Sequence, residues 1–148
     1  MAATKIEGVG AFIYSISTKR YLFLLRNSSK YSGTWAMPGG KVDKDESISV
    51  SLLREINEEL RGLCPNDPST PKIIPIEKFT SDNGNFVYHT FIIPVATEFL
   101  PILNEEHRGF CWVELDDNPK PLHPGVWRTI NFEAVTKKIK TIEKIFTL

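Results

Sequence analysis

The segment that most constrains the fold is residues 46–60, where a helical hydrophobic pattern ends in a cluster of carboxylates. At about 100° per residue, the apolar positions share an arc of about 100°; they are Leu52, Leu53, Ile56 and Leu60. The charged positions share another arc of about 140°; they are Arg54, Glu55, Glu58 and Glu59. The pattern predicts a helix with one face on a core and one charged face.

The ends of this helix are predicted from its flanking residues. Asp43 or Asp45 can cap the N-terminus, where a negative charge suits the helix dipole. Gly62 is placed for a left-handed C-terminal cap.

The carboxylates lie where an anion is least stable. A helix C-terminus carries partial negative charge, and Glu55 and Glu59 repel each other at i,i+4 spacing. Three things could stabilise these negative charges: the Arg54 guanidinium, solvent, or a hard divalent cation, the kind of ion that carboxylate oxygens bind. A solvated amphipathic surface helix would explain the acidic residues without any ligand.

The spacing around the helix favours a ligand. Gly40, five residues, Glu46, seven residues and then Arg54-Glu55-Ile56-Asn57-Glu58-Glu59 resembles the Nudix box, the signature of the Nudix hydrolase family. Residues 33–40, Gly-Thr-Trp-Ala-Met-Pro-Gly-Gly, resemble the family's lead-in. The sequence departs from the box after Glu59, because the terminal glycine, Gly62, arrives one residue late.

The resemblance implies a fold and a chemistry. It implies an α/β (α+β) fold, the Nudix-type α/β/α sandwich with a mixed β-sheet, over a single domain spanning residues 1–148. It also implies Mg²⁺-dependent hydrolysis, with Mn²⁺ as the alternative ion. Glu58 and Glu59 are the implied metal ligands. Glu55 is a further ligand or the base that deprotonates water, and the Gly40 carbonyl adds an oxygen ligand.

Other residues are expected to support this site. The resemblance suggests that Arg54 orients Glu55, while Glu46 supports the loop or the metal site; a plain salt bridge for Arg54 is the alternative. Residues 104–107 look like the segment that supplies a second acid, Glu106, with Glu105 as its substitute. His107 is interpreted as a surface or packed residue.

Binding of the substrate itself is assigned less directly. Arg26 and Lys41 are candidates for gripping phosphates, and Glu46 is grouped with them, although lone basic residues are usually solvated. Most of the aromatic candidates for base stacking are interpreted as core anchors; the candidates are Tyr31, Trp35, Phe86, Tyr88 and Trp112.

The rest of the chain predicts alternating strands, loops and a final helix. Residues 8–16 and 21–25 read as two strands, and residues 27–40 as a loop. Residues 73–80 and 86–97 flank an Asn-Gly turn and predict an antiparallel hairpin. Residues 64–72 read as a connecting loop and residues 109–115 as a strand. Residues 126–145 read as an amphipathic helix with Ile130, Val135, Ile139, Ile142 and Ile145 on one face.

Composition excludes several classes of function. Eighteen basic and eighteen acidic residues give no net charge, so nucleic acid is not an expected partner and an anionic membrane is not attracted. No apolar run is long enough to span a bilayer. Cys64 and Cys111 are in no metal or redox spacing, which favours free thiols and a cytoplasmic location. Composition leaves a homodimer open.

The predicted activity is hydrolysis of a nucleoside diphosphate linked to another group. Nucleoside triphosphates, including oxidised ones, are the leading substrates; nucleotide sugars, ADP-ribose, dinucleoside polyphosphates and capped RNA ends stay open. The alternatives are a catalytically silent nucleotide-binding or protein-binding domain of the same fold and a structural Ca²⁺ site.

Overall fold

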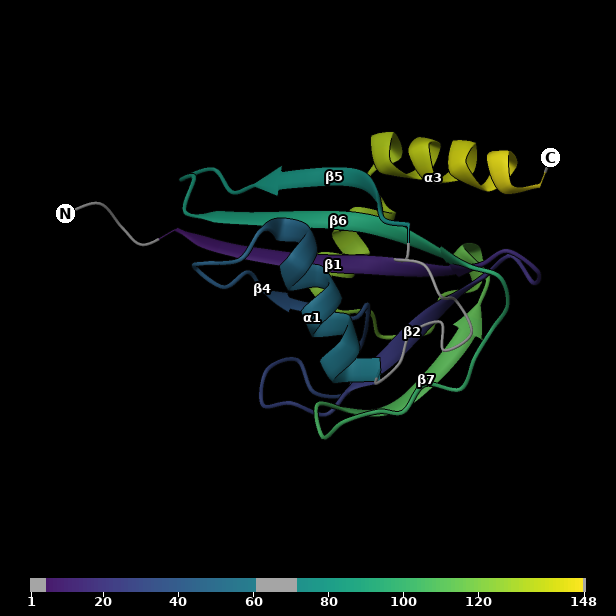
Figure 1. The fold of residues 1–148 in the computed structure, drawn as a ribbon, viewed down its shortest axis with the longest axis horizontal. Helices are drawn as coiled ribbons and strands as arrows, with labels where there is room; N and C mark the ends of the chain where they lie inside the picture. The colour runs from purple at the N-terminus through teal and green to yellow at the C-terminus, as the bar shows by residue number, and fades with distance from the viewer. Residues whose placement is uncertain (1–4, 61–71, 148) are drawn as a thin grey trace.

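The computed structural model describes residues 5–60 and 72–147, and the fold is a mixed seven-stranded sheet with helices on both faces (Figure 1). The strands are β1 (Ile6–Ser15), β2 (Arg20–Arg26), β3 (Trp35–Ala36), β4 (Gly39–Lys41), β5 (Ile74–Thr80), β6 (Phe86–Val95) and β7 (His107–Val113). The helices are α1 (Ile48–Leu60), the 3₁₀ turn η1 (Leu115–Asp117), α2 (Pro124–Ile130) and α3 (Glu133–Phe146). The predicted α/β/α sandwich with a mixed sheet is confirmed.

Strand β1 is the axis of the sheet. It pairs in parallel with β6 along its whole length, from Ile6↔Phe86 to Ser15↔Val95. Its other edge is shared, because Gly8 to Gly10 pair with β4 and Tyr14 and Ser15 pair with β2. The glycine turn that precedes α1 is therefore fixed to the middle of the sheet.

Two apolar clusters hold the helices to the sheet. Leu52, Ile56 and Leu60 of α1 are buried against one face of the central strands. Val135 and Ile139 of α3 are buried against the other face. The helical period predicted for residues 46–60 thus gives the observed core face of α1.

Helix α1 starts later than its flanking acids suggest. The hydroxyl of Ser47 accepts a hydrogen bond from the Val50 N–H at 3.2 Å, so Ser47 caps the helix. The expectation that Asp43 or Asp45 caps it is wrong, because Asp43 turns toward Arg54 instead. The predicted Gly62 cap, Cys64 and most of the predicted loop 64–72 lie outside the described residues.

The C-terminal helix is interrupted. The predicted helix over residues 126–145 is two helices, because α2 ends at Ile130, with Asn131 as its cap, and α3 begins at Glu133. Within α3, Val135 and Ile139 are buried, whereas Ile145 lies about 120° around the helix from Ile139 and is exposed. The predicted loop 27–40 likewise contains the short strands β3 and β4.

Two further predictions have clear outcomes. The hairpin is confirmed, since β5 and β6 are antiparallel and Gly84 of the turn has a φ of +75°. Within residues 5–60 and 72–147, none of the helices has the length and hydropathy that crossing a bilayer requires.

Candidate functional site

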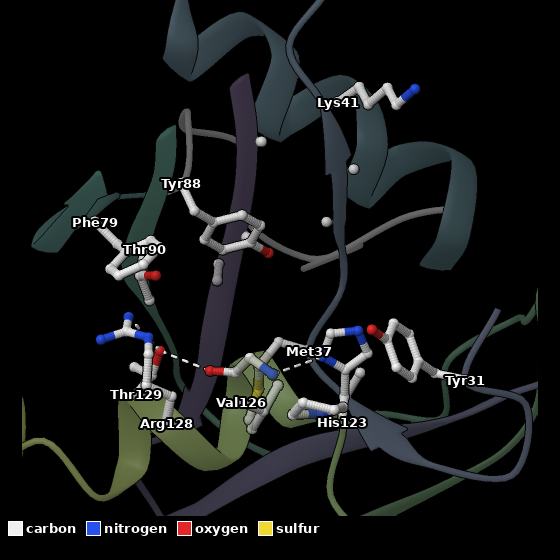
Figure 2. A pocket seen from close by; sticks show the side chains of 18 of the residues that line it. Tyr31, Met37, Lys41, Phe79, Tyr88, Thr90, His123, Val126, Arg128 and Thr129 are labelled. Carbon is white, nitrogen blue, oxygen red and sulfur yellow. Dashed lines mark hydrogen bonds between the residues drawn. The ribbon is translucent and has the colours of Figure 1, made fainter. Parts of the chain in front are cut away.

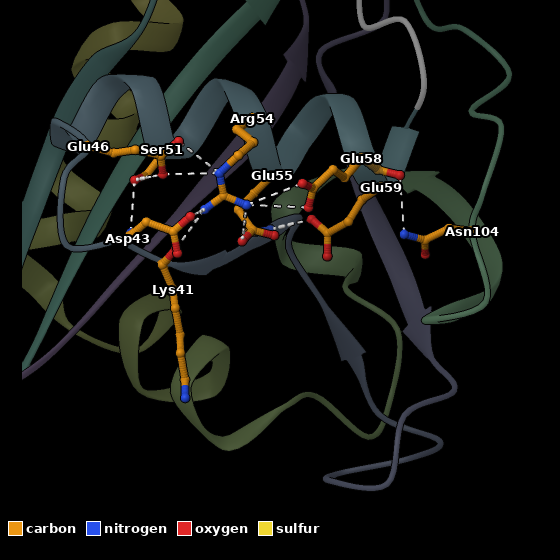
Figure 3. Close-up of polar contacts among 10 residues, drawn as sticks. Lys41, Asp43, Glu46, Ser51, Arg54, Glu55, Glu58, Glu59 and Asn104 are labelled. Carbon is orange, nitrogen blue, oxygen red and sulfur yellow. Dashed lines mark hydrogen bonds and ion pairs between the residues drawn. The ribbon is translucent and has the colours of Figure 1, made fainter.

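Arg54 organises the charged face of α1. Its Nε lies 3.0 Å from both carboxylate oxygens of Glu46, and its other nitrogens reach Asp43 at 3.3 Å and Glu55 at 3.1 Å (Figure 3). The Arg54 guanidinium also donates to the Lys41 carbonyl at 3.2 Å, which ties the glycine turn to the helix. A planar fork of five N–H donors suits this role, and lysine could not reproduce it.

Glu46 serves Arg54 in this arrangement. It accepts hydrogen bonds from the Ser51 hydroxyl at 2.7 Å and from Arg54, and these bonds lower its pKa. The hydrogen bond that Arg54 donates to Glu46 is also the main reason why the pKa of Arg54 is raised. Glu46 therefore contacts Ser51 and Arg54, and its carboxylate is not among the groups that line the cavity described below.

The glycine turn contacts two of the predicted carboxylates. The Gly39 N–H donates to Glu59 Oε2 at 2.7 Å. At Gly40, a Cβ atom would lie 2.3 Å from Glu55 Cδ, so only glycine leaves room for that carboxylate. The turn and the acidic helix thus form one unit, as the Gly-to-Glu spacing suggests.

Glu59 is the most buried of these acids. Its side chain lies close to Glu106 and His107, and one ligand atom from each of the three lies within 4.8 Å of the others. Burial raises the pKa of Glu59 to about 9, with Glu55 and Glu106 adding to the rise. Burial likewise raises the pKa of Glu55. Several carboxyl groups therefore converge on one small volume.

His107 is a neutral neighbour of Glu59. Its Nε2 lies 3.9 Å from Glu59 Oε1, while burial and the Arg26 charge lower the pKa of the imidazole to about 4. Both groups are uncharged at pH 7 when no cation is bound, so the contact is no ion pair. Of the two interpretations of His107, a surface or a packed residue, the structure shows the packed one, since the residue is buried.

The family's divalent ion fits this donor set. Carboxylate oxygens that raise one another's pKa are stabilised in their charged form when a cation binds between them. Glu59 and Glu106 supply carboxylate oxygens and His107 supplies an imidazole. Glu55 lies beside the Gly40 backbone, and its charge adds to the rise in the pKa of Glu59. Glu58 is placed differently, because its carboxylate is half exposed and pairs with Arg54 at 3.3 Å.

A cavity of about 620 Å³ opens beside the glycine turn. Helix α2 and the preceding His123 close one side, while Phe79 and Tyr88 of the hairpin close another (Figure 2). Its residues combine aromatic walls with a few polar groups: Tyr31, Met37, Phe79, Phe86, Tyr88, Thr90, His123, Val126, Arg128 and Thr129. The rings of Tyr31 and His123 meet edge to face at 4.5 Å.

The cavity shows what sequence reasoning missed. Tyr31 and Phe86 line it and are exposed, so their interpretation as core anchors is wrong. Tyr88 also lines the cavity, whereas Trp35 packs against an apolar cluster and Trp112 is buried, as expected. Helix α2 supplies residues for which the sequence offers no motif. Its one local signal is Pro124 at the first helical position, where proline is favoured.

The two predicted basic residues differ in their placement. Arg26 lines the cavity and donates to Ser28 at 2.7 Å and to the Lys30 carbonyl at 3.1 Å. Lys41 also belongs to the cavity lining, but its side chain points away from the cavity (Figure 2). Arg26 is therefore the better placed cation for a ligand that occupies the cavity.

Fold and site together define a class of protein, the α/β/α sandwiches whose acidic helix is held against a glycine turn. A family model described as "NUDIX domain" matches residues 4–131. The chain therefore belongs to the Nudix hydrolase family and is an enzyme of that family, whose members use divalent metal ions.

Similar proteins come from several bacteria. The chain is 30% identical over 119 residues to a dihydroneopterin triphosphate diphosphatase of Haemophilus influenzae, covering 72% of this chain and 73% of the relative. It is 29% identical over 93 residues to the nucleoside triphosphatase NudI of Escherichia fergusonii, covering 59% of this chain and 66% of that protein, just under two thirds. The crystal structure of a MutT Nudix hydrolase from Burkholderia pseudomallei matches with a TM-score of 0.69 and 26% identity, over 86% of this chain and 97% of that one.

Proposed function

We propose that the chain is a pyrophosphohydrolase of nucleoside triphosphates, including oxidised ones, that depends on Mg²⁺ or alternatively Mn²⁺. One observation carries the proposal: Gly39 and Gly40 line the cavity and also touch the carboxylates of α1. A ligand whose organic part fills the cavity would therefore have its phosphates beside Glu55 and Glu59. The names of the two relatives, a triphosphate diphosphatase and a nucleoside triphosphatase, support the same substrate class.

The cavity suits the organic half of such a substrate. Its volume of about 620 Å³ lies within the range of about 300–1,000 Å³ that is typical of small-molecule sites. The Tyr31 and His123 rings offer faces to a planar base, and Thr90 offers a hydroxyl for orientation. Arg26, which also lines the cavity, is proposed to contact the phosphates.

The proposed reaction is attack of water on a phosphorus of the triphosphate. The new P–O bond forms as the anhydride P–O bond breaks, giving a nucleoside monophosphate and pyrophosphate. Glu55 accepts the proton of the water; its raised pKa suits a base that works near neutral pH. Arg54 holds Glu55 in place. Glu59 and Glu106, with Glu58 and the Gly40 carbonyl, would hold the cation, which neutralises phosphate oxygens and acidifies water when bound.

A substrate panel with active-site variants tests the proposal. Pyrophosphate release from dGTP, 8-oxo-dGTP and dihydroneopterin triphosphate is compared with hydrolysis of ADP-ribose and a nucleotide sugar. Glu55→Gln should lower kcat by about 10²- to 10⁴-fold, whereas the matched change Glu133→Gln on exposed α3 should not. Reaction in ¹⁸O-water then identifies the attacked phosphorus. Binding without turnover of any substrate would refute the enzymatic proposal and favour the silent nucleotide-binding domain.

A further inference from the structure

His107 is the least satisfied polar side chain in the described chain. Among the residues that the structure describes, its Nδ1 is the one buried side-chain nitrogen or oxygen without a hydrogen-bond partner. Its side chain is 3% exposed, so water does not readily supply the missing partner. Buried polar groups of this kind are rare. The other ring nitrogen, Nε2, is the one that faces Glu59.

A β-bulge brings His107 to the acidic helix. In the pairing of β2 with β7, Leu25 lies opposite Gly109 and Arg26 opposite His107, so Arg108 is an extra residue. Residues that pair directly share a face of the sheet, and Leu24 and its partner Phe110 pack on the face covered by α1. The bulge therefore puts His107 on this face. Figure 1 shows β2 and β7 side by side near the C-terminal end of α1.

The distance to Glu59 fits a shared ion better than a direct contact. The 3.9 Å between His107 Nε2 and Glu59 Oε1 exceeds the hydrogen-bond range. Two donors that each lie about 2.1 Å from one ion are at most about 4.2 Å apart. Glu59 is also oriented for this, because its other oxygen, Oε2, is held by the Gly39 N–H at 2.7 Å.

We propose that His107 supplies an imidazole nitrogen to the divalent cation held by Glu59 and Glu106, so that the site favours Mn²⁺ over Mg²⁺. Mg²⁺ is bound almost entirely through oxygen ligands, whereas divalent transition metals also accept imidazole nitrogen. A nitrogen ligand should therefore add more to the affinity for Mn²⁺, a transition metal, than to the affinity for Mg²⁺. The inference rests on the proposed metal-dependent hydrolysis and specifies its ion. The observation that carries it is the placement of the buried His107 Nε2 at 3.9 Å from Glu59 Oε1, in one group of donors with Glu106.

The test reads the ligand directly on Mn²⁺ bound to the full chain. Electron spin-echo envelope modulation should show ¹⁴N coupling to Mn²⁺ in the wild type and in the matched control His89→Gln, whose histidine instead pairs with Glu7. The coupling should be lost in His107→Gln. In the same variant the Kd for Mn²⁺ should rise by about tenfold or more, while the Kd for Mg²⁺ changes less than about twofold.

The outcomes separate this inference from the proposed function. Bound Mn²⁺ without ¹⁴N coupling in the wild type overturns the role of His107, even if the protein hydrolyses its substrate. Coupling that persists in His107→Gln overturns it too. The wild-type spectrum decides the question by itself if the variant does not fold. Absence of both Mn²⁺ binding and turnover refutes the metal-dependent function itself.

Discussion

Replacing Gly40 with alanine tests the tight contact between the glycine turn and α1. The new Cβ would lie 2.3 Å from Glu55 Cδ and 2.5 Å from both carboxylate oxygens, where ordinary contact begins at 3.4 Å. The carboxylate must therefore withdraw by about 1 Å, and a misplacement of that size costs about 100-fold in rate. The fold should persist, because the obstructed group is the end of a flexible side chain. We expect kcat to fall about 100-fold with little change in Tm.

The assay for Gly40→Ala is steady-state hydrolysis of the best triphosphate from the panel, with Tm from differential scanning fluorimetry. Gly109→Ala is the matched control, because a Cβ there meets Leu25 at an ordinary 3.6 Å. The control should keep both kcat and Tm near the wild-type values. A Gly40→Ala enzyme with kcat within threefold of the wild type would refute the view that Glu55 must lie against this backbone.

Three further perturbations probe charge, support and cavity. Burial raises the pKa of Glu59 to about 9, so the folded chain without metal keeps a proton that the unfolded chain releases at about pH 4.5. The stabilisation from the protonated Glu59 is lost as pH rises through 9. The Tm measured in EDTA should therefore fall between pH 7 and 9. In Glu59→Gln this dependence of Tm on pH should disappear. Arg54→Lys cannot keep both contacts to Glu46, so kcat should fall by about 10- to 100-fold; an unchanged kcat in steady-state assays would contradict this support. Gly10→Ala would place a Cβ 2.2 Å from the Tyr88 hydroxyl and push the ring into the cavity. In steady-state assays KM should therefore rise about tenfold, with kcat nearly constant. A change confined to kcat would argue against a binding role for the cavity.

The elements that the sequence predicts well are those with local signals. The apolar period of α1 and the Asn-Gly turn of the hairpin each depend on residues close together in the chain, and both appear as expected. The break between α2 and α3 has no glycine or proline to mark it. Asn131 caps α2 there, and its backbone N–H donates to the carbonyls of Trp127 and Thr129. Tertiary packing, and no local sequence signal, selects this position for the break.

The site divides in the same way. The charged positions from Glu46 to Glu59 sit on one helix, so their spacing already predicts which of them share a face. The cavity is assembled from segments far apart in sequence, including Tyr31, Tyr88 and His123. An aromatic residue in a strand reads as core unless the neighbouring strand is known, and Gly8 and Gly10 beside Tyr88 leave the space for its ring.

His107 shows why strict alternation fails near a functional site. Counted back from Phe110 and Trp112, His107 belongs on the face opposite α1, where it could not meet Glu59. The extra residue Arg108 reverses that assignment by one position. The bulge interrupts an otherwise regular strand pair, and no local sequence signal marks it. The backbone hydrogen bonding lost there is best explained by the new direction that the bulge gives to the His107 side chain. The bulge delivers His107 Nε2 to within 3.9 Å of the most buried carboxylate of the acidic helix, which is the arrangement expected when the two groups share a cation.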